Sequence, residues 1–166
     1  MQADNVYMSS GGFGNQDVIE ILEAFTSHGI CNVEFSNGKL TGEFSEIIRP
    51  FLQSSKVMLH NYFPQPSKSF VINLASDDPL IVNLSVKQLI KSIDLCCEFG
   101  INKFSFHAGF LIDPEPKHLG KEIPKILIQP RDKSIKLFIS TIKSIAKYAK
   151  ERKIKLFIEN NVISKK

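Results

Sequence analysis

The sequence predicts an α/β fold in which about five parallel strands alternate with four intervening helices, the arrangement of a partial (β/α)8 barrel. Two observations predict it. Short apolar runs of strand length alternate with longer segments whose apolar residues recur at helical spacing. In addition, four of the five short runs carry an ionisable residue at or near their C-terminal end, which is where β/α barrels gather their functional groups.

The expected strands are short, and the expected helices between them have clear start and stop signals. The first helical segment ends at Gly29, where a left-handed conformation can close a helix. The third begins at Asp78-Pro79, an N-cap followed by a proline in the first turn, and ends at Gly100. The expected strands are 6–9, 30–35, 57–60, 104–107 and 155–159. The apolar stripes of the helices lie at 18–25, 44–52, 82–93 and 135–149.

Length and composition predict a single domain, and the charge gives no strong indication of nucleic-acid binding. The 166 residues are 43% hydrophobic, which is enough for one core, and we expect a single domain over residues 1–166. The net charge of +4 arises from 21 basic and 17 acidic residues. Its excess gathers in 133–166, and this mild bias is more typical of a solvated helix face than of nucleic-acid binding.

The sequence contains no signal for export or membrane insertion. The first residues lack a basic leader with an apolar stretch, and no apolar run approaches the roughly 18 residues of a membrane span. We therefore expect a cytoplasmic protein with no membrane partner. The three cysteines are odd in number and sit in apolar segments, so we expect buried free thiols instead of a disulfide framework.

Ionisable residues mark the ends of four expected strands. They are Glu34, His60, His107 and Glu159. A buried parallel strand should be almost wholly apolar, so charge at the same end of successive strands indicates a shared site.

Strand alternation predicts which neighbours of these residues face the barrel interior. Side chains two positions apart share a face, so Ser105 should lie with His107, and Phe157 with Glu159. The residues between them should pack under the helices. These are Phe104, Phe106, Leu156 and Ile158.

Two expected connections, 61–77 and 108–132, are longer than the usual loops of α/β units. Each directly follows a strand that ends in histidine, which favours a functional role for both loops.

Two imidazoles and a carboxylate at one rim could perform two kinds of chemistry. His60, His107 and Glu159 could bind a divalent metal such as Zn²⁺ or Mn²⁺, because both group types are suitable ligands. The same three residues could instead act as general acid, general base and substrate-binding groups. Each histidine taken alone could also have only a structural hydrogen-bonding role.

Three stretches of the chain resemble the xylose-isomerase-like TIM-barrel superfamily. They are 59–64 with 72–76, then 105–110, then 158–161. That superfamily contains sugar and sugar-phosphate isomerases and epimerases, and also the endonuclease IV class of abasic-site (AP) endonucleases. The resemblance implies a TIM barrel of roughly 250 residues, so the chain would be its N-terminal part with the C-terminal strands missing.

The resemblance implies different roles for the same residues in the two enzyme classes. In the nucleases the residues matching His60, His107 and Glu159 bind zinc. In the sugar enzymes the glutamate matching Glu159 binds the metal and acts as acid and base, while the histidines contact substrate. Ala108 replaces a proline of the nuclease motif.

Three further residues are expected to bind substrate. They are Glu34, Asn61 and Asn160. A glutamate at the end of the second strand, here Glu34, is similar to the sugar enzymes.

These observations leave three hypotheses. The first is a truncated sugar or sugar-phosphate isomerase/epimerase that depends on a divalent metal, Zn²⁺ or Mn²⁺, and binds a carbohydrate or sugar phosphate. The second is a zinc-dependent abasic-site nuclease of the endonuclease IV type, which would bind DNA. The third is an inactive barrel fragment that needs a partner or self-associates through its open barrel edges.

Overall fold

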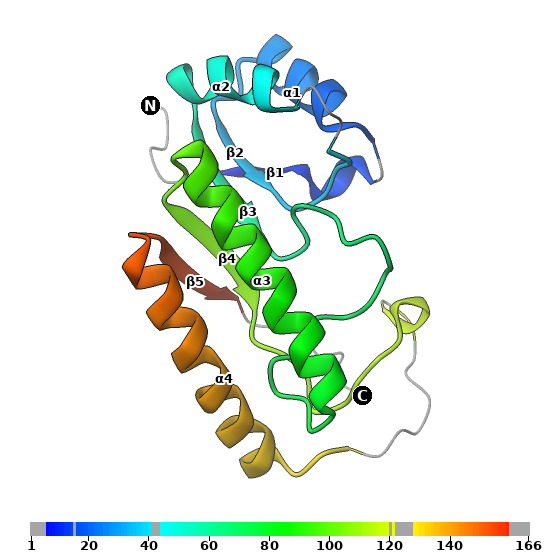
Figure 1. Ribbon diagram of the computed structural model, residues 1–166. Helices are drawn as coiled ribbons and strands as arrows, with labels where there is room; N and C mark the ends of the chain where they lie inside the picture. Colours follow the sequence, from blue (N-terminus) through cyan, green and yellow to red (C-terminus); the bar gives the residue numbers. More distant parts are fainter. Residues whose placement is uncertain (1–5, 15, 41–43, 120, 122–127, 160–166) are drawn as a thin grey trace.

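The computed structural model describes residues 6–14, 16–40, 44–119, 121 and 128–159. Its centre is a parallel sheet of five strands in the order β1-β2-β3-β4-β5, and four α-helices alternate with the strands along the chain (Figure 1). The strands are β1 (Met8–Ser9), β2 (Asn32–Phe35), β3 (Lys56–His60), β4 (Lys103–His107) and β5 (Lys155–Glu159). The helices are α1 (Val18–Ser27), α2 (Phe44–Ser54), α3 (Pro79–Phe99) and α4 (Arg131–Glu151), with short 3-10 helices η1 (Ser10–Phe13) and η2 (Pro116–His118).

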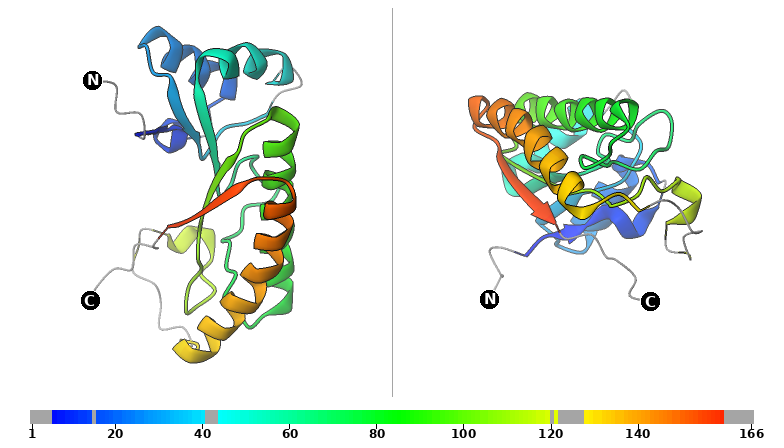
Figure 2. Two further views of the ribbon diagram at one scale, coloured as in Figure 1. Left: turned by 90° about the vertical axis from the view of Figure 1, so that its left-hand side faces the viewer. Right: turned by 90° about the horizontal axis from the view of Figure 1, so that it is seen from below.

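The strand order follows the sequence order, as it does in a (β/α)8 barrel, so the predicted partial barrel is confirmed. Helices α3 and α4 lie side by side and pack against β4 and β5 (Figure 2). The expected N-cap at Asp78 is present, since its carboxylate accepts a hydrogen bond from the Leu80 N–H at 2.8 Å. Gly100 closes α3 in the left-handed conformation with φ of 67°. No described helix is both long and apolar enough to cross a membrane.

The predicted alternation in β4 is confirmed, and that in β5 holds only in part. Phe104 and Phe106 are fully buried on the helical face, with their rings stacked at 5.9 Å. Leu156 packs against the same core, whereas Ile158 is 52% exposed. β5 pairs only with β4 among the described strands, so the end of this strand is covered less than the middle of the sheet.

Two other expectations need correction. The first strand covers two residues and not 6–9, and Val6 before it is 65% exposed. An edge strand that pairs on one side has fewer hydrogen bonds to extend it. Of the three cysteines only Cys96 is buried, because Cys31 lies in the connection just before β2 and Cys97 is on the exposed face of α3.

The two long loops predicted to be functional are fastened to each other by one buried amide. The Asn73 side chain donates to the Ile112 carbonyl at 3.0 Å and to Asp113 Oδ1 at 2.7 Å, and it accepts from the Phe110 N–H at 3.0 Å. Ser76 adds a hydrogen bond of 2.8 Å to the other oxygen of Asp113. These contacts join the segment after β3 to the segment after β4.

Gly109 lies against Asn73, within the contact between the two loops, and should not tolerate a side chain. Its φ is +134°, and a Cβ built there would lie 2.5 Å from Asn73 Oδ1. We expect Gly109→Ala to lower the free energy of unfolding by about 1–3 kcal/mol, the usual cost of such backbone strain. Gly12→Ala is the control, because nothing lies within 4 Å of its added Cβ. Equal denaturant midpoints for the two variants would contradict the role given to Asn73.

Candidate metal site at the carboxyl ends of the strands

The site is formed by the last residues of three neighbouring strands. His60 ends β3, His107 ends β4 and Glu159 ends β5, and the parallel register sets His107 opposite Glu159. One potential ligand atom from each of the three lies within 4.8 Å of the others. The two imidazole rings are nearly perpendicular, with centroids 5.0 Å apart. The sequence prediction that these side chains converge is therefore met in the structure.

The three side chains differ in their access to solvent. His60 is buried, His107 is half-buried, and the Glu159 side chain is 45% exposed. Glu159 thus lies on the side of the site that is open to solvent, while the two histidines lie deeper.

Burial dominates the electrostatics of His60. It lowers the pKa of the imidazole below its ordinary value of 6.5, and His107 lowers it further. The carboxylates of Glu34 and Glu159 oppose this shift, with oxygens 3.7 Å and 3.6 Å from His60 Nδ1. A neutral imidazole keeps a nitrogen lone pair, which is the form that can bind a metal.

A second layer of polar groups lies beneath His60. Ser105, in β4, is paired with His60 by the register and is 1% exposed. Its hydroxyl lies 2.8 Å from His60 Nδ1 and donates to Glu34 Oε1 at 2.9 Å. Glu34, expected from the sequence to bind substrate, is thus held by Ser105 at the end of β2.

Two buried polar atoms beside the histidines have no hydrogen-bond partner among the described residues. They are His107 Nδ1 and the Asn61 side-chain oxygen. Leaving such an atom unpaired costs about 1–3 kcal/mol, so each is a candidate to contact a ligand. Two imidazoles and a carboxylate with an unpaired ring nitrogen are a donor set that fits Zn²⁺ or Mn²⁺.

A family model matches most of the amino-acid sequence. The model of the xylose isomerase-like TIM barrel matches residues 43–161, which include all three potential ligands. The chain belongs to this family. A comparison with curated protein sequences finds no significant match.

Several solved structures have a fold similar to that of this chain. An L-ribulose 3-epimerase superposes with a TM-score of 0.63 and 15% identity, over 92% of this chain and 48% of that one. A xylose isomerase-like TIM barrel protein from Mycobacterium smegmatis, in complex with magnesium, gives a TM-score of 0.60 and 14% identity, over 92% and 54%. A protein from Thermus thermophilus soaked with ZnCl2 gives 0.53 and 19%, over 86% and 52%. The chain therefore spans about half the length of these structures, and at such identities the likeness concerns the fold.

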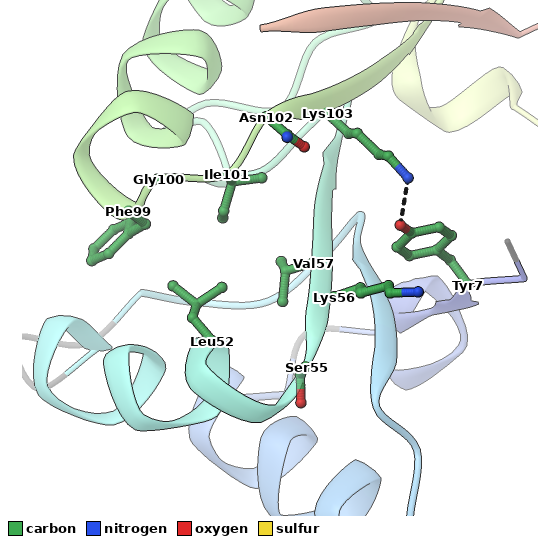
Figure 3. Close-up of a pocket in the computed structure, with 10 residues that line it drawn as sticks. All are labelled: Tyr7, Leu52, Ser55, Lys56, Val57, Phe99, Gly100, Ile101, Asn102 and Lys103. Carbon is green, nitrogen blue, oxygen red and sulfur yellow. Dashed lines mark hydrogen bonds between the residues drawn. The ribbon is translucent and has the colours of Figure 1, made fainter. Parts of the chain in front are cut away.

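The opposite end of the sheet has the opposite charge. A hollow of about 400 Å³ lies where β3 and β4 begin, and Lys56, Lys103 and Tyr7 line it (Figure 3). Lys103 Nζ donates to the Tyr7 hydroxyl at 2.7 Å. Lysine is the first residue of β3, β4 and β5, and none of the described strands carries lysine or arginine elsewhere. Each of β3, β4 and β5 thus begins with a cationic side chain and ends with an imidazole or a carboxylate.

The sequence located most of the site but missed one of its members. Five of the predicted site residues lie at the carboxyl ends of the strands, namely Glu34, His60, Asn61, His107 and Glu159. Asn160 is outside the described residues. Their individual roles stay predictions. Strand alternation placed Ser105 on the interior face, and its buried hydroxyl was the signal that could have suggested a hydrogen-bonding role.

The lowered pKa of His60 predicts how stability should depend on pH. The unfolded chain takes up a proton near the ordinary pKa of 6.5, whereas the folded chain does so only at lower pH. The unfolded state therefore binds more protons in this window, and stability falls as pH decreases through it. We expect His60→Gln to lose this part of the pH dependence in chemical denaturation at several pH values. Parallel pH profiles for wild type and variant would contradict the prediction.

Proposed function

We propose that this chain binds a divalent metal ion through His60, His107 and Glu159 and provides this part of the active site of a sugar or sugar-phosphate isomerase/epimerase. The convergence of three ligand atoms within 4.8 Å at the strand ends carries the proposal. Two structures with the same fold support it, one of them an L-ribulose 3-epimerase and the other a magnesium complex.

The geometry suggests a division of labour among the side chains. When bound, a divalent cation would act as a Lewis acid that polarises the sugar carbonyl. Glu159, the most exposed of the three, would take a proton from the carbon beside that carbonyl and deliver it to the carbonyl carbon, while the hydroxyl proton of the first carbon passes to the carbonyl oxygen. The unpaired side-chain oxygen of Asn61 would accept a hydrogen bond from a substrate hydroxyl. Asn160, next to Glu159 in the sequence, is proposed to bind substrate as well.

Charge favours a sugar over DNA as the substrate. DNA binding requires cationic side chains that neutralise phosphates. In the described strands the lysines stand at the far end, away from the site. Two of the three arginines have partners on helices, since Arg49 stacks over Phe99 and Arg152 lies 3.5 Å from Asp94.

Metal binding is the first test of the proposal. We expect the chain to bind Zn²⁺ or Mn²⁺ in isothermal titration calorimetry, and His60→Ala or Glu159→Gln to weaken binding by at least about tenfold. His28→Ala is the matched control, because that histidine is exposed and contacts the Ala24 carbonyl at the end of α1. Equal affinities for His60→Ala and His28→Ala would place the metal elsewhere.

Proton exchange is the test of the reaction. The metal-loaded chain, incubated in D₂O with neutral and phosphorylated ketoses, should introduce deuterium at the carbon beside the carbonyl. Glu159→Gln should slow this exchange by about 10²–10⁴-fold, the usual contribution of a general base. Cleavage of duplex DNA at an abasic site without any sugar exchange would support the nuclease instead. Metal binding without either activity would support an inactive barrel fragment.

A further inference from the structure

We propose that Ser105 and Glu34 are positioning residues that hold the proton of His60 on Nδ1 and so present Nε2 as its metal-binding atom. The inference rests on the metal site proposed above. It also changes the role expected for Glu34, which would act through Ser105 instead of contacting substrate.

The direction of the hydrogen bonds follows from the number of protons available. The Ser105 hydroxyl has one proton, and an ionised carboxylate such as Glu34 can only accept. The hydroxyl therefore donates to Glu34 Oε1, 2.9 Å away. Its lone pair is then free to accept from His60 Nδ1–H at 2.8 Å. The other nearby acceptor, the Leu59 carbonyl, is 3.5 Å from the hydroxyl, beyond the usual O–H···O range.

The surroundings of His60 Nδ1 favour the same tautomer. Three oxygen atoms face this nitrogen, from Ser105 at 2.8 Å, Glu159 at 3.6 Å and Glu34 at 3.7 Å. Both carboxylates are acceptors when ionised, so a proton on Nδ1 is stabilised and a lone pair there is not. Burial of Ser105 and His60 excludes water that could compete for the hydrogen bond.

The fold keeps the three groups in line. Glu34, His60 and Ser105 belong to the adjacent strands β2, β3 and β4, and the register pairs His60 directly with Ser105. A neutral imidazole has one donor and one acceptor nitrogen, so a proton fixed on Nδ1 leaves Nε2 as the acceptor. Metal-binding histidines usually donate their other N–H to a polar partner, and here a hydroxyl backed by a carboxylate fills that place.

Nuclear magnetic resonance of the metal-free chain tests the tautomer directly. Long-range ¹H–¹⁵N spectra, recorded well above the titration range of histidine, distinguish a proton on Nδ1 from one on Nε2. The chain has only four histidines, and the His60 signals are those missing from His60→Gln. We expect wild-type His60 to be protonated on Nδ1. Protonation on Nε2 would overturn the proposal.

Substitutions then test the two positioning residues. Ser105→Ala and Glu34→Ala should increase the Nε2–H form and weaken Zn²⁺ binding by about 10–100-fold. Ser105→Thr and Glu34→Gln keep a hydroxyl and an acceptor oxygen, so both should largely restore the Nδ1–H form. Ser92→Ala is the matched control, since it removes another fully buried hydroxyl, which donates to the Gln88 carbonyl in α3.

The outcomes separate this inference from the proposed function. If the tautomer shifts in Ser105→Ala but wild type binds no metal, the positioning role stands and the metal site fails. If wild type binds Zn²⁺ and Ser105→Ala changes neither tautomer nor affinity, the metal site stands and the positioning role fails. Amide spectra report whether each variant is folded, and if Ser105→Ala is not, the wild-type tautomer and Glu34→Ala decide.

Discussion

The parallel register of β3, β4 and β5 is the constraint on which the candidate site depends. It sets His60 opposite Ser105 and His107 opposite Glu159, so residues far apart in the sequence end at one edge of the sheet. Because side chains alternate between faces, a slip of one residue would turn these polar groups toward the helices. Fully buried Phe104 and Phe106 oppose such a slip, since it would expose them. The apolar core thus fixes the position of the polar site.

The features predicted from the sequence were those with a local pattern. Helical periodicity and strand alternation extend over a few residues, so they indicated the elements and the strand-end residues such as His60 and Glu159. The extent of β1 and the exposure of Ile158 depend on which strands lie beside them, and no local pattern contains that information. The Ser105 hydrogen bonds join three strands, so alternation could give the face of the hydroxyl but not its partners.

The contacts of Asn73 could not be predicted from the sequence for the same reason. They join the two loops that follow the histidines of the site. Its amide joins residues about forty positions apart, in the loops that follow His60 and His107. Long loops are usually mobile, and catalytic groups beside mobile loops are held loosely. Here the buried Asn73 amide and the Asp113 carboxylate join the two loops, through residues 73–76 of the first and 110–113 of the second. The two loops that follow His60 and His107 are therefore linked to each other as well as to the strands that they leave.

The chain spans about half the length of the matched structures, and its three potential ligands are as many as a catalytic zinc site commonly uses. Catalytic zinc sites commonly use three protein ligands and leave a fourth position for water or substrate, whereas structural sites close all four. His60 and His107 lie at the floor of the site, and the part-exposed Glu159 side chain leaves one side open. Within the described strands, Glu34 and Glu159 are the carboxylates that could balance the charge of a bound cation. Under the proposed function, a carbonyl or hydroxyl of the sugar would approach the metal from this open side.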